Sequence, residues 1–370
     1  MTVLVSALAF LILLTFLILI HEFGHFAVAR RVGVVVEEFG FGLPPRARTL
    51  FRHKGTNFTL NWVPFGGFVR LKGETATTQH DLSAPGSFHR ASFSGRIAIL
   101  IAGVFMNFLL ALVLLTVGFS VGRWVPTYFS LEEMKADGKS GVIELQLGVM
   151  IEKVLSGGSA AKAGVPERSI LASIDGQALA EADEVASLQE GKRRVTYEVL
   201  TGTGFLTKQT FTLTLEDGKS GVVVTTYPRH VAAPLRSVGS AFLLALREAR
   251  VMTVQTVIGI GHLFSSLAQT GKVPEGITGI VGIAQLTHAS VLAGFMTYLR
   301  LVALISLSLA VLNILPFPAL DGGRVLFVLA EAVVRRPLNQ RFELVTNAIG
   351  LSVLIFLIVL ITFYDIIRLF

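Results

Sequence analysis

Two histidines four residues apart, with a glutamate beside the first, are the residues best suited to chemistry in this chain. They stand in the run His21-Glu22-Phe23-Gly24-His25. Residues four apart share one face of a helix, so both imidazoles can bind one Zn²⁺, with Glu22 beside a water on the metal. The spacing is typical of a zinc-dependent hydrolase.

A catalytic zinc ion needs a third protein ligand and one open position. The best candidate is Asp321, which follows two prolines and precedes two glycines in the run Asn313-Ile314-Leu315-Pro316-Phe317-Pro318-Ala319-Leu320-Asp321-Gly322-Gly323. An aspartate at a helix start is also an ordinary cap. A carboxylate at membrane depth is costly unless a cation pairs with it, and this favours the ligand role.

The composition is that of a membrane protein, because 52% of the 370 residues are hydrophobic and only 15% are charged. Four apolar runs are long enough to span a bilayer: Val3–Ile20, Ile97–Gly122, Thr297–Leu315 and Ala348–Tyr364. Val238–Leu267 and Ile277–Leu292 carry charged or polar residues, and we interpret them as interfacial or partly inserted helices. We therefore predict a multi-pass α-helical membrane protein with about four transmembrane helices.

The basic residues predict the orientation. Arginines and lysines are concentrated between the first two runs and again between the last two, so both segments are expected in the cytoplasm. Both termini and residues 123–236 are then extracytoplasmic. A cleaved signal peptide is the alternative for the first run, but no basic residue precedes it and no small-residue cleavage site follows it.

Residues 34–72 are rich in β-branched and aromatic residues and are predicted to form a membrane-associated β-hairpin region. Gly40–Pro45 and Val63–Val69 are expected to be its turn-rich ends. Its backbone must pair within itself or with a bound peptide. An unpaired edge at Phe65, Gly66, Gly67, Phe68 and Val69 is the predicted binding site for an extended substrate.

Residues 123–236 read as an inserted α+β domain with its core at about 142–228. The runs Leu147-Gly148-Val149, Gly158–Val165 and Ile174-Asp175-Gly176-Gln177 resemble landmarks of a bacterial PDZ domain. Arg168-Ser169 replaces the usual Gly-Asp pair. The resemblance implies that Leu147, Gly148 and Val149 form a loop that binds a peptide carboxylate. Plain steric filtering of bulky substrates is the equally weighted alternative.

The two motifs together closely resemble those of the site-2 protease family, specifically the bacterial members with an extracytoplasmic PDZ insert. The histidine motif lies at the first span and the Leu-Asp-Gly motif at the third, as in that family. Two departures stand out: Ala102-Gly103-Val104-Phe105-Met106-Asn107 lacks the usual proline, and there is one PDZ-like domain instead of two. The expected domains are residues 1–122, 123–236 and 237–370.

The resemblance implies Zn²⁺ held by His21, His25 and Asp321, with Glu22 as the catalytic base. Asn313 is a polar side chain within a span, and we favour it for holding the substrate backbone or the oxyanion, with an interhelical hydrogen bond as the alternative. For Asn107, an interhelical hydrogen bond is the favoured reading. The implied substrates are single-span membrane proteins of the bacterial inner membrane, such as anti-sigma factors or signal-peptide remnants, already trimmed outside.

Two other functional classes remain open at this point. One is a non-catalytic membrane scaffold that binds protein C-termini, and the other is a membrane zinc hydrolase acting on prenylated proteins. Intact Glu22 and Asp321 argue against the first, and the Leu-Asp-Gly motif argues against the second. The sequence has no cluster of basic residues interleaved with aromatic residues, so it does not indicate nucleic-acid binding. The chain has no cysteine, so thiol chemistry is excluded.

Overall fold

A computed structural model describes residues 2–74, 84–336 and 338–368. The chain divides into two compact units. A helical unit comprises residues 1–122 and 237–370, and an insert comprises residues 123–236.

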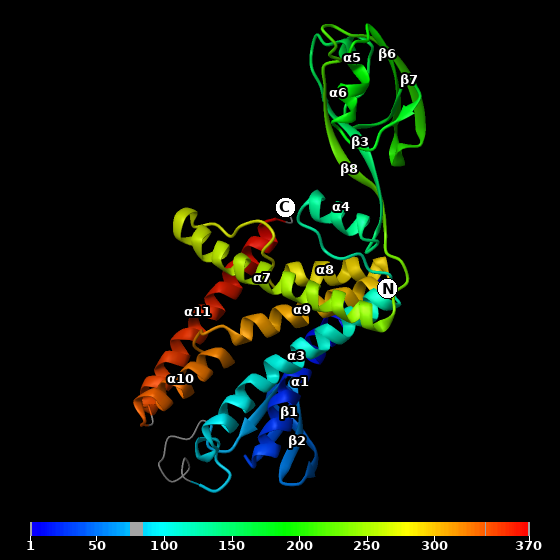
Figure 1. Cartoon of the computed structure of the whole chain (residues 1–370). Coiled ribbons are helices and arrows are strands. Elements are labelled where there is room, and N and C mark those ends of the chain that lie inside the picture. The colour runs from blue at the N-terminus through cyan, green and yellow to red at the C-terminus, as the bar shows by residue number, and fades with distance from the viewer. Residues whose placement is uncertain (1, 75–83, 337, 369–370) are drawn as a thin grey trace. The chain divides into compact units, whose positions relative to one another are not determined.

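The helical unit contains seven long or medium helices and a β-hairpin among its described residues (Figure 1). The helices are α1 (Thr2–Val32), α3 (Phe93–Ser120), α7 (Val238–Thr270), α8 (Ile280–Ala293), α9 (Phe295–Ile314), α10 (Asp321–Val334) and α11 (Gln340–Ile367), with a 3₁₀ turn at Phe88–Arg90; α8 and α10, each of 14 residues, are the shorter ones. Serine side chains cap two of the long helices: Ser92 accepts from Gly95 N at α3, and Ser237 accepts from Ser240 N at α7.

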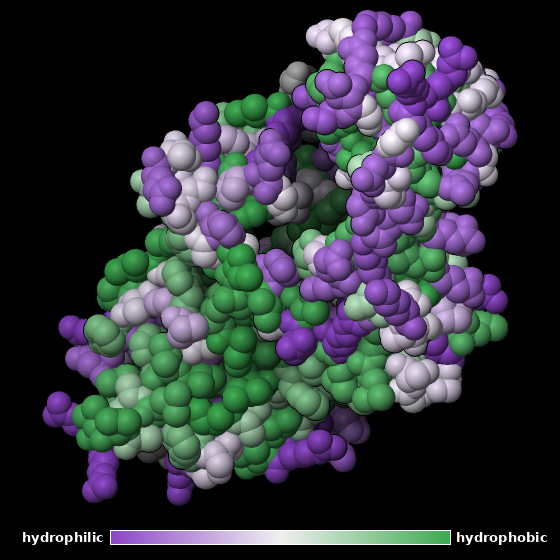
Figure 2. Space-filling view, turned by 45° about the horizontal axis from the view of Figure 1, so that its top comes forward, coloured by the Kyte–Doolittle hydropathy of each residue, from purple (hydrophilic) through white to green (hydrophobic). Residues whose placement is uncertain are grey.

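Five described helices are long and apolar enough to cross a membrane, by length and composition: α1, α3, α7, α9 and α11. Four of them contain the predicted spans. The fifth, α7, covers the run predicted to be interfacial because of its charges. Glu248 of α7 is buried, and Arg300 of α9 lies 3.6 Å from it. Figure 2 shows apolar side chains gathered over the surface of this unit, as a membrane protein requires.

Contacts near the ends of the helices set their relative directions. Tyr298, early in α9, donates to Ala9 O near the start of α1 at 2.9 Å, and Asp321, after α9, lies beside His21 in the last third of α1. Helices α1 and α9 therefore run in the same direction. In α3 the direction is reversed, because Ile99 near its start contacts His25.

Helix α11 also runs opposite to α9, and contacts at Glu248 in the first third of α7 and at Gly271 after it place both parts of α7 on the side where α9 begins. Asn347 in the first third of α11 accepts from Ala319 N, beside the Asp321 turn, whereas Asp365 near its end accepts from Gly279 N at the start of α8. Tyr364 donates to Gly271 O, directly after α7. The C-terminal end of α7 therefore lies at the same side as the N-terminus of α1, as does the end of α3 from which the insert departs.

The hairpin consists of β1 (Val36–His53) and β2 (Thr56–Leu71) and folds back on itself. Residues 36–41 pair with residues 67–71 on one side and with residues 57–60 on the other. Segment 67–71 is thus an outer edge of a small sheet. The predicted turn-rich ends, Gly40–Pro45 and Val63–Val69, instead lie inside the strands as irregular, bulged stretches. Glycine allows this because a side chain at Gly40 would overlap the Phe68 ring.

A buried carboxylate stabilises this folded-back sheet. Glu38 is 3% exposed and accepts hydrogen bonds from Arg46 and Thr59, and Arg70 Nη1 lies 3.2 Å away. Burial opposes ionisation of Glu38, but the hydrogen bonds from Arg46 and Thr59 and both arginine charges outweigh it, so the pKa of Glu38 is lowered. The network joins the inner strand to both of its neighbours.

The insert is a six-stranded antiparallel sheet with short helices. Along the sheet the order is β7-β6-β4-β3-β8, with β5 paired to β4. Its elements are α4 (Leu131–Lys139), β3 (Glu144–Val154), α5 (Ser159–Lys162), β4 (Ser169–Ile174), β5 (Gln177–Ala178), α6 (Glu184–Gln189), β6 (Arg194–Thr201), a 3₁₀ turn (Thr203–Phe205), β7 (Thr207–Thr214) and β8 (Val222–Ala232). Strands and short helices together agree with the α+β class predicted for the insert.

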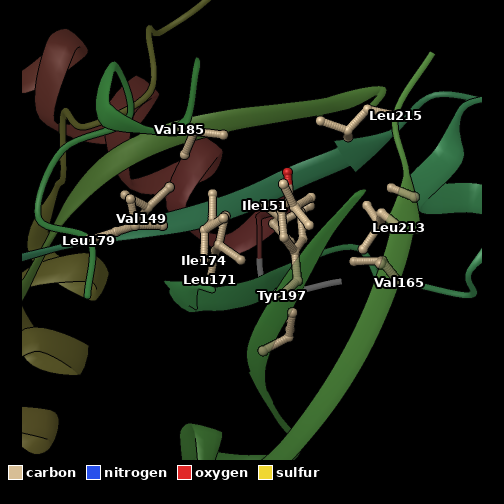
Figure 3. Close-up of a cluster of buried hydrophobic side chains, with 13 residues drawn as sticks. Val149, Ile151, Val165, Leu171, Ile174, Leu179, Val185, Tyr197, Leu213 and Leu215 are labelled. Atoms are coloured by element: carbon tan, nitrogen blue, oxygen red, sulfur yellow. The ribbon is translucent and has the colours of Figure 1, made fainter. Parts of the chain in front are cut away.

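An apolar core stabilises the insert (Figure 3). Its side chains come from β3, β4, β6 and β7 and point toward one another: they include Val149, Ile151, Leu171, Ile174, Tyr197 and Leu213, all fully buried. Alternation places Val149 and Ile151 of β3 on one face of the sheet. In β4 an irregularity between Leu171 and Ser173 brings Leu171 and Ile174, which are three residues apart, into the same core.

The predicted peptide loop at Leu147, Gly148 and Val149 is wrong as a loop. All three residues lie inside strand β3, where they pair with Pro228, Tyr227 and Thr226 of β8. Their backbone groups face a neighbouring strand and are not presented as a nest for a carboxylate.

Candidate metal and catalytic site

The two histidines lie in the last third of α1, one helical turn apart and on one face. His21 Nε2 and His25 Nε2 are 3.1 Å apart, and both residues are buried. The apolar sequence on either side forms the helix, and Gly24 between the histidines lets α3 approach, since a side chain there would overlap the carbonyl oxygen of Ala102.

Asp321 reaches the histidines from the first position of α10. The N-cap residue of α10 is Leu320, and it makes no side-chain cap bond. Asp321 lies one residue further on, so the alternative that Asp321 only caps the helix is wrong. Its Oδ2 is 3.0 Å from His21 Nε2 and 3.4 Å from His25 Nε2. A tight turn after α9 makes this possible: side chains at Gly322 and Gly323 would overlap carbonyl oxygens of residues 314–317.

The distances among the three atoms fit one zinc ion. Zinc bonds of about 2.1 Å in a tetrahedral site separate neighbouring ligand atoms by roughly 3.3 Å. The three measured separations lie between 3.0 and 3.4 Å. Among the described residues, His21, His25 and Asp321 are the group of three side chains that could hold a metal ion. Within the same described residues, Asp321 Oδ2 is buried and has no hydrogen-bond partner. A cation at this point would satisfy all three groups.

Gly103 of α3 forms the wall opposite the metal ligands. A side chain there would overlap His25 Nε2 and lie 2.7 Å from His21 Nε2. Gly103 was not predicted to lie at the metal ligands, and its only signal in the sequence was its place in the second-span signature. Ile99, one turn earlier, accepts from His25 Nδ1 at 2.8 Å. This bond orients the ring and leaves Nε2 free for a metal.

Glu22 lies beside the three ligands and faces the hairpin. Its Oε2 accepts from the backbone N–H of Val69 at 2.9 Å. A cavity of about 170 Å³ opens at this point, lined by the three metal-ligating residues, Glu22, Phe68, Val69, Leu71, Glu74, Ile99, Leu100 and Arg324. The cavity has room for a few atoms of a substrate backbone beside the glutamate.

Comparison with known proteins agrees with this arrangement. The model of peptidase family M50 matches residues 9–357. The chain belongs to peptidase family M50. The family is the one that the two motifs predict, the site-2 proteases.

Several full-length bacterial relatives are similar to this M50 chain. A Clostridium perfringens protein whose name contains the words zinc metalloprotease is 30% identical over 356 residues, 95% of each chain. A similarly named protein of Clostridium acetobutylicum is 27% identical over 356 residues, 95% of this chain and 94% of the relative. An Enterococcus faecalis protein whose name contains the words protease eep is 25% identical over 456 residues, 99% of each chain.

The predicted substrate residues of this M50 peptidase fall into two groups. Phe68 and Val69 line the cavity. Phe65, Gly66 and Gly67 belong to the same strand but are not among the lining residues; Gly67 packs closely on Leu19 of α1. Asn313, near the end of α9, is partly exposed and is also absent from the lining residues that the structure describes.

Asn107 differs from its predicted role. Its side chain is 1% exposed, and neither its amide nitrogen nor its amide oxygen has a hydrogen-bond partner among the described residues. The predicted interhelical bond is made instead by the backbone, because Ser306 of α9 donates to Asn107 O at 2.8 Å.

The insert of this M50 chain has a groove at a site that the sequence analysis missed. Strand β8 is an edge of the sheet, and a cavity of about 1190 Å³ runs between it and α6. Val222 and Val224 of β8, Val185 of α6 and the turn at residues 214–221 line it. The available signal was Gly218-Lys219-Ser220-Gly221 directly before the β-branched run of β8.

Proposed function

We propose that this M50 chain is a zinc-dependent endopeptidase that cleaves transmembrane segments of single-span membrane proteins. The observation that carries the proposal is the trio of His21, His25 and Asp321, which converges within an apolar helical unit at the separations that zinc requires. A carboxylate and two imidazoles form a donor set that zinc prefers. Relatives named as zinc metalloproteases support the choice of metal.

His21, His25 and Asp321 would hold the ion at the wall of the cavity that Glu22 also lines. When bound, zinc supplies Lewis acidity that lowers the pKa of water toward about 7 and polarises a carbonyl group. Glu22 takes the proton from the attacking water and returns it to the leaving amine. For this, its carboxylate must release the N–H of Val69, which it accepts in this structure.

The edge strand at residues 67–71 provides a track for the substrate. A transmembrane helix hides its carbonyl groups in its own hydrogen bonds, so cleavage requires local unwinding. Pairing the unwound segment with this edge replaces the lost bonds, each of which costs several kcal/mol when left unmade in lipid. Phe68 and Val69 place that edge at the cavity. Asn313 stays a proposed backbone or oxyanion ligand.

We place the active site near the cytoplasmic face of a bacterial inner membrane. Helices α1, α3, α9 and α11 alternate in direction, and both ends of α7 lie on the side where α1 begins, so four crossings fit the contacts and α7 lies along the outer interface. The basic residues after α1 orient that end toward the cytoplasm. Both termini and the insert are then extracytoplasmic.

The groove between β8 and α6 supports a role for the insert in substrate selection. A free C-terminus left by an earlier extracytoplasmic cut can add to the β8 edge as a strand. Steric exclusion of bulky outer domains is the alternative. In either case the substrates are single-span proteins already trimmed outside, such as anti-sigma factors or signal-peptide remnants.

Cleavage of a tagged single-span peptide by the purified full chain in liposomes tests the proposal. Wild type with zinc is expected to produce two fragments, and Glu22→Gln at least about a hundredfold fewer, because a general base contributes about 10²–10⁴. Equal cleavage by the two proteins would remove Glu22 from the mechanism. Peptide binding without cleavage by either would favour the scaffold reading.

A further inference from the structure

The outer edge of the sheet at residues 67–71 is already occupied by two carboxylates. Val69 N donates to Glu22 Oε2 at 2.9 Å, and Leu71 N donates to Glu74 Oε2 at 3.1 Å. These donors are two residues apart, which is the spacing at which one edge of a strand presents its N–H groups. An incoming strand needs the same two groups for its own carbonyl oxygens.

Glu74 is held in place from α10. Its other oxygen, Oε1, forms an ion pair with Arg324 Nη1, three residues after Asp321 and so on nearly the same face of the helix. The Arg324 guanidinium lies 5.9 Å from the centre of the Phe88 ring. The Glu74 and Arg324 side chains are 17% and 25% exposed, and both line the cavity of the catalytic site.

The contacts of Glu22 and Glu74 have different consequences. Release of Val69 by Glu22 belongs to the proposed chemistry, since the base must reach water. Glu74 has no task in that chemistry, yet its carboxylate covers a donor on the substrate track. A hydrogen bond to a charged acceptor is about twice as strong as a neutral one, so its displacement opposes binding.

We propose that Glu74 and Arg324 form a latch that closes the substrate edge at Leu71 and opens when a substrate strand pairs there. The latch rests on the proposed function, because it acts on the same substrate track. Only the fraction of molecules with an open latch can bind, so the latch raises the apparent dissociation constant for substrate. Glu74 therefore acts as a positioning residue that sets affinity, and it stays paired with Arg324 when displaced.

The alternative is a plain structural clamp, and the two readings predict opposite signs. If the pair only fastens the hairpin to α10, weakening it disorders the track and raises KM. If it competes with substrate, weakening it lowers KM. The kcat value changes little under the latch reading, because neither residue touches the reacting atoms.

The experiment compares kcat and KM for a single-span peptide cleaved by the full chain in liposomes. Glu74→Gln is expected to lower KM about fivefold, the ratio that about 1 kcal/mol gives, with kcat within about twofold of wild type. Glu74→Asp keeps the charge for Arg324 but is one methylene shorter, so it also lowers KM. Glu37→Gln, which removes an exposed carboxylate of the same hairpin, serves as the matched control and leaves both constants unchanged.

Hydrogen exchange supplies a second readout that does not depend on turnover. In Glu74→Gln the Leu71 amide is expected to exchange faster while the Val69 amide, held by Glu22, keeps its rate. A raised or unchanged KM in both Glu74 variants, or equal acceleration at both amides, would overturn the latch. Absence of cleavage by wild type would instead overturn the proposed function, and the latch with it.

Discussion

In the helical unit, the buried polar side chains of His21, His25 and Asp321 face one another, whereas the interior of the insert is apolar around Tyr197. At the centre of the insert core the hydroxyl of Tyr197 has its hydrogen bonds, because it bonds with Ser220 at 2.8 Å and with Gln189. Among the described residues of the helical unit, Asp321 Oδ2 has no hydrogen-bond partner and lies beside the two imidazole nitrogens alone. A buried carboxylate left incomplete beside two imidazoles is characteristic of a cation site and not of a core.

The largest effect is expected from a glycine-to-alanine change at the metal ligands, compared with the same change at a glycine elsewhere in the helical unit. Gly103→Ala places a methyl group against both imidazoles, so zinc content and cleavage are expected to fall at least about a hundredfold. Gly259→Ala in α7, where a side chain meets nothing within 4 Å, is the matched control and leaves both unchanged. The measurements are metal analysis and peptide cleavage. Full zinc content in Gly103→Ala would contradict the geometry of the site.

Removing apolar volume from the insert tests the other side of the comparison. Leu171 is fully buried in the insert core, and Leu171→Ala is expected to destabilise the insert by about 3 kcal/mol. Hydrogen exchange in β3 and β4 of the full chain should accelerate accordingly. Zinc content should stay at the wild-type level, since the ligands belong to the other unit. Loss of zinc would show that the two units are not separable.

Glu38 allows a test of a buried charge that is fully paired. Glu38→Gln leaves Arg46 and Arg70 without their carboxylate and is expected to destabilise the hairpin by about 3 kcal/mol at neutral pH. The pKa of Glu38 is lowered, so its stabilisation is present above its ordinary value of 4.5 and is lost as pH falls through the lower folded-state value. Thermal unfolding from pH 7 to pH 3 should show the two proteins converging below about pH 4.5. A constant difference would exclude the charge as the cause.

The smallest effect is expected at Tyr197. Burial raises the pKa of Tyr197 to about 12, so the hydroxyl remains a hydrogen-bond donor across the working pH range. Tyr197→Phe should cost about 1 kcal/mol, the usual value of a hydrogen bond, and leave cleavage unchanged. Exchange rates in β6 report the change. A loss several times larger would mean that the tyrosine network, and not apolar packing, holds the insert.

The sequence predicted those features that depend on local spacing. His21 and His25 are fixed by the helical period, and Asp321 by a motif whose prolines and glycines force a turn. The membrane spans followed from apolar run length. For the insert the sequence predicted the α+β class and a core at about 142–228, and strands β3 to β8 lie within or close to that range.

The remaining features depend on contacts between distant segments. The sequence did not predict that residues 36–41 pair with two segments at once. Glycines and prolines that are typical of turns also permit bulges within a strand. Gly103 acquires its role only when α3 packs on α1. The peptide loop was misplaced because a Leu-Gly-Val run has the same pattern in a loop and in a central strand, and only strand order shows that β8 is the free edge.

Zinc content measured beside peptide cleavage tests the central claim most directly, that one metal site in the membrane unit does the chemistry. Wild type and Glu22→Gln are expected to hold about one zinc per chain, while Asp321→Ala holds little. Only wild type should cleave. Full zinc content in Asp321→Ala, or cleavage by Glu22→Gln at the wild-type rate, would contradict the account.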